Sequence, residues 1–239
     1  MLLYKYCDQA GIGILRSRTV WLSRPRAFND PFDVNPHIDK FDEPIRMGAY
    51  VFQKTNDIVV LSLAENCKSL LMWAHYAEHH RGFLIGFNGG GRLLDDGLVA
   101  RLPLDAMSYC HHRPSADRLK HLSDQKLYFT KSSEWAYEQE WRLVTSNLFG
   151  PNGPALEVKP DTFSFQLMTK DIRTVIVGYR AAALFPEMYT ILREPDYRHV
   201  SLKLALPHVE RFELQLKNWP RSKWGDAAPP ELLGYSGND

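Results

Sequence analysis

The sequence contains few cysteines, and their spacing excludes a disulfide framework or a zinc cluster built from cysteine pairs. Only Cys7, Cys67 and Cys110 occur in 239 residues. They are odd in number and far apart, and no two of them have the short CxxC spacing of zinc and redox sites. We therefore expect reduced thiols that are mostly buried.

A surplus of charge of one sign is also missing. Lys and Arg total 29 and Asp and Glu total 28, which gives a formal net charge of +1. A protein that coats duplex DNA needs excess basic side chains to neutralise phosphates. The balance argues against such a partner, although it leaves a local basic groove open.

Long hydrophobic runs are absent as well. No segment approaches the roughly 20 apolar residues that span a bilayer, and the apolar stretch at the N-terminus is too short for a signal peptide. The composition, 44% hydrophobic and 24% charged, is that of an ordinary globular protein. We expect no membrane partner and a cytoplasmic location.

The pattern of the chain predicts one domain over residues 1–218 and a C-terminal tail over 219–239. The length is near the upper limit for one hydrophobic core, and proline and glycine become frequent after Trp219. Apolar runs are joined by irregular connections, without regular alternation of strands and helices. We expect an α+β fold with small mixed or antiparallel sheets around a cleft and few helices.

Periodicity places the elements along the chain. Apolar positions at helical spacing predict a helix that Asn66 caps and that ends near Gly82, and further helices over 115–126 and 181–192. A segment over 135–144 begins as a loop and becomes a strand. Other predicted strands cover 2–6, 20–23, 58–63, 83–87, 99–109, 172–177, 200–206 and 212–216.

The run Tyr137-Glu138-Gln139-Glu140-Trp141-Arg142 has the most reactive pattern in the chain. Residues two apart on a strand share a face and lie about 6.6 Å from each other, so Glu138, Glu140 and Arg142 are expected on one side. The ordinary alternative is a solvated outer face with alternating charges. Both interpretations stay open on spacing alone.

Aromatic residues flank these carboxylates and favour a site. Trp135, Tyr137 and Trp141 would wall it, and low local polarity strengthens the effect of a carboxylate on a developing positive charge. This arrangement suits cleavage of a glycosidic bond, in which a carboxylate stabilises a cationic sugar.

A second cluster raises the question of a metal site. His75 and His79 stand four residues apart, a spacing that can chelate zinc on one helical face. Tyr76 occupies the position of the glutamate in the HExxH pattern, and only the distant run Cys110-His111-His112 offers further ligands. Solvated or core histidines are the simpler interpretation, and we expect no metal.

The segment Phe28-Asn29-Asp30-Pro31-Phe32-Asp33 predicts an ordered loop, because prolines and an Asn-Asp pair interrupt the backbone. As a structural turn, it would use Asn29 or Asp30 to bond backbone amides, with the phenylalanines in the core. As a ligand-binding loop, it would present Arg26, Asn29 and Asp30 as hydrogen-bonding groups.

Several separated motifs, in this order, resemble the bacterial domain-of-unknown-function 2971 family. They extend over nearly the whole chain up to about Leu216. The motifs are Leu3-Tyr4-Lys5-Tyr6, Trp21-Leu22-Ser23-Arg24-Pro25, Phe28 to Asp33, Leu61-Ser62-Leu63, Met72-Trp73-Ala74-His75-Tyr76, Trp135 to Arg142 and Val175-Ile176-Val177-Gly178.

The resemblance implies a distant similarity to the ADP-ribosyltransferase-like fold. In enzymes of that fold with a Glu-x-Glu motif, the second glutamate holds the ribose next to nicotinamide and the first orients the acceptor. Glu140 and Glu138 match these positions. The first strand here has Lys5 where such enzymes carry Arg or His, and Ser23 stands where they carry a Ser-Thr-Ser run. Both departures weaken the match.

These inferences predict an NAD-dependent ADP-ribosyltransferase or NAD glycohydrolase with Glu140 and Glu138 as catalytic residues and an unknown acceptor. The alternatives are a non-enzymatic nucleotide-binding or sensor module on the same fold, and a zinc hydrolase using His75 and His79. The residues expected to bind NAD are Tyr4, Lys5, Ser23, Arg26, Asn29, Trp73, His75, Tyr76 and Arg142.

Overall fold

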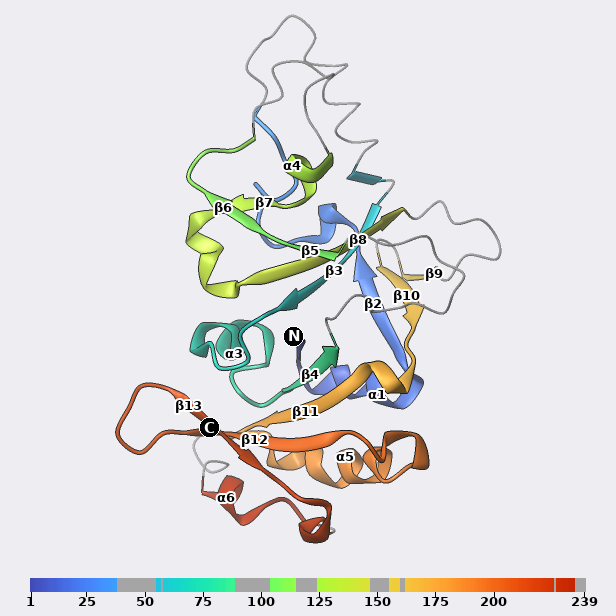
Figure 1. The fold of residues 1–239 in the computed structure, drawn as a ribbon, viewed down its shortest axis with the longest axis vertical. Helices are drawn as coiled ribbons and strands as arrows, with labels where there is room; N and C mark the ends of the chain where they lie inside the picture. Colours follow the sequence, from blue (N-terminus) through green and yellow to red (C-terminus); the bar gives the residue numbers. More distant parts are fainter. Residues whose placement is uncertain are drawn as a thin grey trace, which may run out of the picture. The chain divides into compact units, whose positions relative to one another are not determined.

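The computed structural model describes residues 1–37, 55–56, 58–88, 104–114, 124–146, 155–159, 162–225 and 227–234. The chain forms two compact units, each assembled from separate stretches of sequence (Figure 1). Unit 1 comprises Met1–Thr19, Leu63–Asp95 and Leu167–Asp239, and unit 2 comprises Val20–Ser62 and Asp96–Gln166. The prediction of one domain over 1–218 did not anticipate this interleaving.

Unit 1 contains a mostly antiparallel sheet. Its strands are β1 (Leu2–Cys7), β4 (Phe83–Asn88), β11 (Ile172–Gly178), β12 (Ser201–Pro207) and β13 (Leu214–Asn218). They follow the order β13-β12-β11-β4-β1, with β11 and β12 parallel and the other neighbouring pairs antiparallel. Strand β4 lies between β1 and β11, and residues Phe83 to Phe87 are all buried, so both faces of this strand are covered, which explains the continuous apolar run.

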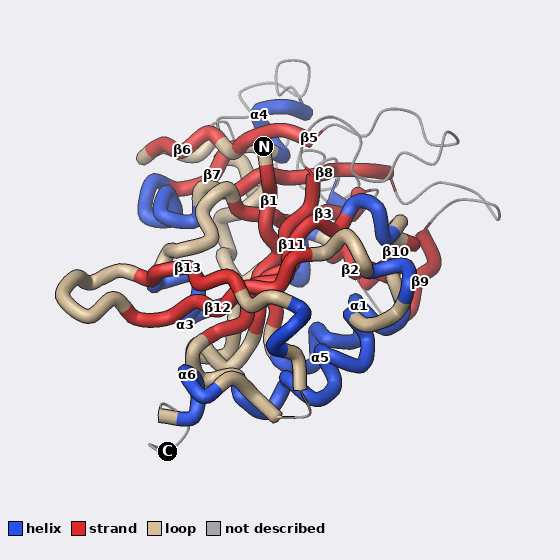
Figure 2. Tube along the Cα trace, turned by 60° about the horizontal axis from the view of Figure 1, so that its bottom comes forward, coloured by secondary structure: helices blue, strands red, loops and turns tan. Residues whose placement is uncertain are grey.

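Short helices accompany this sheet. They are α1 (Ile12–Ser17), α3 (Leu70–Tyr76), α5 (Phe185–Leu192) and α6 (Pro230–Leu233), with 3-10 turns η1 (Gln9–Gly11), η4 (Thr169–Asp171), η5 (Ala182–Leu184), η6 (Pro195–Tyr197) and η7 (Arg221–Lys223). The connection between the parallel strands β11 and β12 carries α5, which lies beside the sheet in Figure 2. A parallel pair needs such a crossover.

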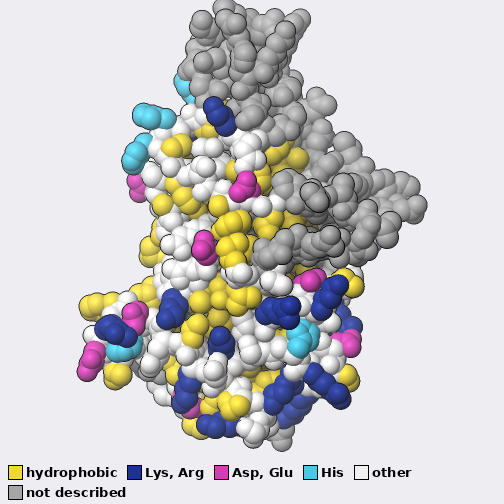
Figure 3. Space-filling view, viewed as in Figure 1, with side chains coloured by type: hydrophobic (Ala, Val, Ile, Leu, Met, Phe, Trp, Pro, Cys, Tyr) yellow, Lys and Arg dark blue, Asp and Glu magenta, His cyan; other side chains and the backbone are white. Residues whose placement is uncertain are grey.

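The described part of the C-terminal tail packs against α5. Arg221 donates hydrogen bonds to the carbonyl oxygens of Leu192, at 2.9 Å, and Tyr197, at 2.5 Å, and the indole of Trp224 stacks on Tyr189. A cation suits the end of a helix, because the last carbonyl groups lack partners within it. Figure 3 shows Lys and Arg gathered over the lower part of the molecule, where Figure 1 draws α5 and β12. The predicted boundary at residue 218, between one domain and a C-terminal tail, stays a prediction.

Unit 2 combines antiparallel pairing with one separate parallel pair. Its elements are β2 (Thr19–Ser23), η2 (Pro25–Ala27), β3 (Ile58–Ala64), β5 (Leu104–Ala106), β6 (Ser108–Cys110), α4 (Asp124–Tyr128), β7 (Thr130–Ser132), η3 (Ser133–Glu138), β8 (Glu140–Ser146), β9 (Ala155–Lys159) and β10 (Thr162–Gln166). Strand β8 pairs with β3 and β5, β3 continues to β2, β10 and β9, and β6 pairs with β7. The last residues of β3 belong to unit 1.

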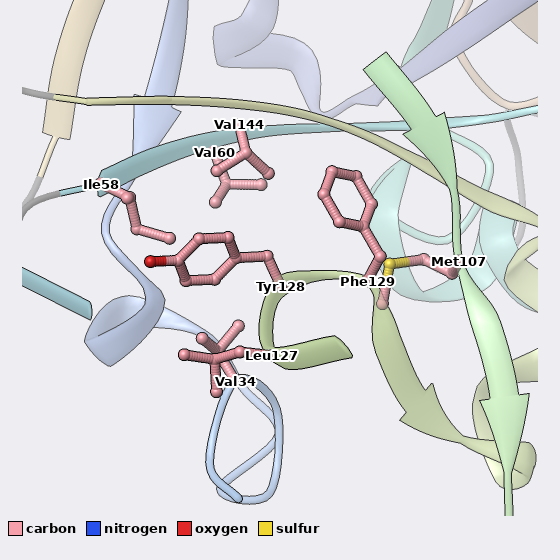
Figure 4. Packing of buried hydrophobic residues seen from close by; sticks show 8 residues of the cluster. All are labelled: Val34, Ile58, Val60, Met107, Leu127, Tyr128, Phe129 and Val144. Atoms are coloured by element: carbon pink, nitrogen blue, oxygen red, sulfur yellow. The ribbon is translucent and has the colours of Figure 1, made fainter. Parts of the chain in front are cut away.

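A hydrophobic cluster supports β3 and β8 in unit 2. Burying side chains of this size contributes roughly 1.5–3 kcal/mol each, so the cluster fixes the strand that carries Glu140. Figure 4 shows its members: Val34, Ile58, Val60, Met107, Leu127, Tyr128, Phe129 and Val144.

The α+β class with mostly antiparallel pairing and few helices is confirmed, and so are most of the predicted strands. The helix expected to end near Gly82 is shorter. It ends at Tyr76, its N-cap is Ser69, and the Asn66 side chain instead accepts a hydrogen bond from the Lys68 amide. The predicted segments 99–103 and 115–123 lie outside the described residues.

The cysteines are only partly as predicted. All three are free thiols; Cys7 is buried, Cys67 is half-buried and Cys110 is exposed. The prediction of mostly buried thiols is therefore wrong for Cys110, which ends the short strand β6.

None of the helices in the described residues is long and apolar enough to cross a membrane.

Candidate functional site

The two predicted catalytic glutamates come from different elements of unit 2. Glu138 ends η3, Gln139 follows with a positive φ of 44°, and Glu140 begins β8. The prediction that both glutamates lie on one strand is therefore wrong. The left-handed residue between them ends the 3-10 turn and starts the strand, a backbone conformation that propensity patterns do not reveal.

Both carboxylates nevertheless meet at one side chain. The ammonium nitrogen of Lys131, on β7, lies 2.6 Å from Oε2 of Glu138 and 3.0 Å from Oε2 of Glu140. The same ammonium lies 3.8 Å from Oδ2 of Asp33. Lys131 therefore joins three carboxylates from three separate segments of the unit.

Arg142 completes the cluster from the same face of β8 as Glu140. Its Nε donates to Oε1 of Glu140 at 2.7 Å, and its Nη1 donates to Oδ1 of Asp33 at 2.8 Å and to the carbonyl oxygen of Tyr128 at 3.0 Å. A second guanidinium nitrogen, Nη2, bonds Asp33 Oδ2 and Glu140 Oε2. We call Asp33, Lys131, Glu138, Glu140 and Arg142 the charge cluster.

Burial overturns the interpretation of a solvated outer face. Glu138, Glu140 and Arg142 are only 3%, 5% and 1% exposed. Three carboxylates and two cations leave the charge cluster with one surplus negative charge when all five groups are ionised. Buried charge at this density is costly unless it is paired and hydrogen-bonded, and every member here is.

The pairing sets the ionisation of the cluster. Burial alone raises the pKa of Glu140, but the charges of Arg142 and Lys131, with hydrogen bonds from Arg142 and Ser62, outweigh it and hold the pKa at about 2. Burial lowers the pKa of Lys131, yet the neighbouring glutamates raise it overall. Glu140 is therefore a carboxylate and Lys131 an ammonium at neutral pH.

Aromatic rings border the charge cluster on two sides. The Lys131 ammonium lies 5.0 Å from the ring centroid of Trp135, whose indole contacts Tyr137. The guanidinium of Arg142 lies 5.1 Å from the ring of Phe28. Trp141 lies on the opposite face of β8 from Glu140, because side chains alternate along a strand. The predicted aromatic wall thus consists of Trp135 and Tyr137.

A tyrosine outside the predicted set anchors the start of β8. The Glu140 amide donates to the hydroxyl oxygen of Tyr109 at 2.7 Å. Burial raises the pKa of Tyr109 to about 12, although its bond to the Glu140 backbone acts in the opposite direction. The hydroxyl is therefore neutral and fixes the backbone of the second glutamate.

The loop after β2 agrees in part with each of the two interpretations made from the sequence, the structural turn and the ligand-binding loop. Asp30 accepts a hydrogen bond from the Phe32 amide at 2.8 Å, as a structural turn requires. Phe32 is 58% exposed, so the prediction that both phenylalanines fill the core is wrong. Asn29 and Arg26 are exposed, and Arg26 donates to Asn56 at 3.4 Å.

The remaining predicted NAD-binding residues belong to two units. Ser23 is half-buried on β2 and pairs with Val60 in unit 2. In unit 1, Tyr4 and Lys5 lie on β1 and are half-buried. Burial and Cys67 raise the pKa of Tyr4 to about 12. The other members of unit 1 are Trp73, His75 and Tyr76 on α3.

Helix α3 does not support the zinc interpretation. Because it ends at Tyr76, His75 lies in its last turn while His79 follows with a positive φ of 52°. The two histidines therefore do not share a helical face. In the part of the chain that the structure describes, no three His, Cys, Asp or Glu side chains gather as metal ligands do. Trp73 is fully buried, and its indole donates to the carbonyl oxygen of Cys67.

Besides Tyr109, sequence reasoning missed three members or neighbours of the site. Lys131 and Asp33 belong to the charge cluster, and Ser62 hydrogen-bonds to Glu140. One signal was present: an arginine that is buried requires carboxylates, and Asp33 is the last residue of the predicted ordered loop. Lys131 carried no comparable signal.

Comparison with known proteins gives one match. A family model described as "Protein of unknown function (DUF2971)" matches residues 72–143. No curated protein and no solved structure matches the chain. The matched residues include four members of the charge cluster: Lys131, Glu138, Glu140 and Arg142. The predicted relationship to the DUF2971 family is therefore confirmed over residues 72–143.

Proposed function

We propose that the chain is an NAD-dependent ADP-ribosyltransferase, or an NAD glycohydrolase, in which Glu140 stabilises the ribosyl cation and Glu138 orients the acceptor. One observation carries the proposal: the two carboxylates of the Glu-x-Glu motif converge on Lys131, at 2.6 and 3.0 Å. The resemblance to the ADP-ribosyltransferase-like fold supplies the reaction type.

The electrostatics of the cluster support this chemistry. Breaking the bond between nicotinamide and ribose develops positive charge on the sugar, and a fixed carboxylate lowers the barrier without reorganising. Glu140 keeps its negative charge at neutral pH because its pKa is about 2. The surplus negative charge of the cluster acts in the same direction.

The proposal requires a hydrogen-bonding position on Glu140 for a ribose hydroxyl. A carboxylate has about four lone-pair sites. Arg142 uses two of them and Lys131 a third, with both partners buried. Ser62 also bonds to Glu140 and is exposed on β3. We propose that a ribose hydroxyl replaces the Ser62 hydroxyl when NAD binds.

Other residues then have supporting roles. Arg142 is engaged by Glu140 and Asp33, so it positions the carboxylate. Ser23, Arg26 and Asn29, which belong to the same unit as the charge cluster, remain proposed NAD contacts.

The decisive experiment measures release of nicotinamide from NAD by the full chain. Glu140→Gln keeps the size of the side chain and removes its charge, so it should lower the rate at least ~10²-fold. Glu134→Gln is the matched control, because Glu134 is an exposed residue of the same 3-10 turn. Equal rates for wild type and Glu140→Gln would remove Glu140 from the mechanism.

Glu138 is tested by comparing transfer with hydrolysis. If Glu138 orients the acceptor, Glu138→Gln should lower the transfer of labelled ADP-ribose more than it lowers nicotinamide release. A parallel loss of both activities would instead place Glu138 with Glu140 in stabilising the cation.

A second candidate is a non-enzymatic module that binds a nucleotide on the same fold. It is favoured by the extent to which Lys131 and Arg142 already engage Glu140, and by Lys5 in place of an Arg or His on the first strand. Lysine offers a point charge without the planar two-pronged grip of arginine. Saturable NAD binding without nicotinamide release would select this module over the enzyme.

A further inference from the structure

A serine and a histidine outside the charge cluster form a close contact in unit 2. Ser133 Oγ lies 2.8 Å from Nδ1 of His111. The pairing of β6 with β7 explains the contact: these parallel strands place Cys110 opposite Ser132, so the residues that follow each of them come together. Nothing assigned so far uses this pair.

The surroundings leave the pair accessible. His111 is exposed and Ser133 is half-buried, and their bond lies at the surface. Ser132 has a different role, because its Oγ accepts a hydrogen bond from the Glu134 amide as the N-cap of η3. Two adjacent serines therefore differ: one caps the turn, and the other contacts an imidazole.

A contact between a hydroxyl and an imidazole nitrogen is the arrangement that activates a serine. When the proton of the neutral imidazole resides on Nε2, the Ser133 hydroxyl donates to the Nδ1 lone pair. A serine is a weak nucleophile alone, and a hydrogen-bonded base that accepts its proton during attack contributes about 10²–10⁴-fold.

The position of Ser133 links it to the proposed reaction. Ser133 begins η3 and Glu138 ends it. Five steps of a 3-10 turn, at ~2.0 Å each, separate the two Cα atoms by about 10 Å along the turn. Ser133 and the proposed acceptor-orienting residue, Glu138, therefore belong to one short element.

We infer that Ser133 is an ADP-ribose acceptor within the chain itself, with His111 as its base; this inference rests on the proposed function. Ser133 Oγ forms a bond to C1′ of the ribose as the bond from C1′ to the nicotinamide nitrogen breaks. The electron pair of that bond leaves with nicotinamide, which becomes neutral, and the serine proton passes to Nδ1 of His111. The products are ADP-ribosyl-serine, nicotinamide and a proton.

The test incubates the full chain with NAD and follows two readouts. The first is nicotinamide release by wild type, and the second is the residue that carries ADP-ribose, located by mass spectrometry with electron-based fragmentation. We expect the modification on Ser133, its loss in Ser133→Ala, and its retention in the matched variant Ser132→Ala. His111→Ala should lower the rate of modification at least ~10-fold while Ser133 remains in place.

The outcomes separate the two claims. Nicotinamide release with Ser133 unmodified overturns the acceptor and leaves the proposed function standing. Absence of nicotinamide release from wild type overturns the proposed function and the acceptor with it. Modification of Ser133 at the wild-type rate in His111→Ala overturns the role of the imidazole. Incubation with free ADP-ribose in place of NAD must leave Ser133 unlabelled, because a label there would show chemical glycation and overturn the enzymatic assignment.

Discussion

The guanidinium of Arg142 grips the carboxylate of Asp33 with two nitrogen atoms across 109 positions of sequence. Both side chains are buried, at 1% and 2% exposure. The pair ties the loop after β2 to β8, so the strand that carries Glu140 is fixed by an ion pair as well as by the hydrophobic cluster. A planar two-pronged contact of this kind also sets orientation, which a single bond does not.

Removal of Asp33 should destabilise unit 2. Asp33→Ala leaves two nitrogen atoms of the buried Arg142 guanidinium without the carboxylate that they bond, and breaking a buried pair typically costs about 3–5 kcal/mol. Hydrogen exchange of the β8 amides measures the loss within this unit. Asp105→Ala is the control, because Asp105 is exposed on β5, and it should cost less than about 1 kcal/mol. Equal losses in the two variants would show that the Asp33 pair contributes no more than a surface contact.

Because the charge cluster carries a surplus negative charge, removing a carboxylate should restore part of the stability that is lost when a cation is removed. Lys131→Met removes the cation that joins Glu138 and Glu140, and it should cost about 3–5 kcal/mol because three carboxylates then face one guanidinium. Adding Glu138→Gln removes one of those charges. The double variant should therefore be more stable than Lys131→Met alone.

The free energies of unfolding by denaturant, measured for wild type, each single variant and the double variant, test whether the double variant is the more stable one. Lys131→Arg is the conservative comparison, because it keeps the charge while changing its shape. Additive effects of the two substitutions would mean that the ammonium and the Glu138 carboxylate do not interact energetically, contrary to their 2.6 Å separation.

Acid should remove the contribution of Glu140 to stability. Its folded pKa is about 2, below the ordinary value of 4.5. A group whose pKa is depressed on folding stabilises the native state above its unfolded pKa, and this stabilisation is lost as pH falls through the folded pKa. Glu140→Gln should therefore be less stable than wild type at pH 7, and the difference should shrink between pH 4.5 and about 2. Unfolding free energies measured across that range test it; a constant difference would contradict the depressed pKa.

The elements of this fold could be predicted from sequence wherever burial alone decides them. The run from Phe83 to Phe87 is apolar because both faces of β4 are buried, and this signal can be recognised without knowing which strands pair with β4. The end of α3 could not be predicted in the same way. The left-handed residues that follow it have ordinary side chains, and only their packing in unit 1 explains their conformation.

The candidate site, too, could be predicted from the sequence only in part. The Glu-x-Glu spacing predicted that the two carboxylates lie together, and they do, but not because they share a strand face, since Glu138 lies on a 3-10 turn. What brings them together is Lys131, seven positions before Glu138 in the sequence and on another strand. An ion pair between separate elements depends on topology, which periodicity does not encode.

Close backbone packing explains the glycine at the end of the motif Val175-Ile176-Val177-Gly178. A Cβ at Gly178 would lie 2.2 Å from the carbonyl oxygen of His80. His80 and the two residues before it all have positive φ, from 48° to 68°. The Gly178 amide also donates to the carbonyl oxygen of Gly82 at 3.0 Å. Gly178 thus allows β11 to approach a turn whose own backbone is strained.

Gly178→Ala should therefore destabilise unit 1. The methyl group would meet backbone atoms, which cannot rotate away as a side chain can, so we expect a loss of at least ~2 kcal/mol. Gly13→Ala is the matched control: nothing lies within 4 Å of a Cβ there, and alanine in α1 should stabilise by up to ~1 kcal/mol. Hydrogen exchange of the β4 and β11 amides measures both effects in the same unit. Opposite signs for the two glycines would establish the close approach at Gly178, whereas a neutral Gly178→Ala would mean that the turn at His80 can move aside without cost.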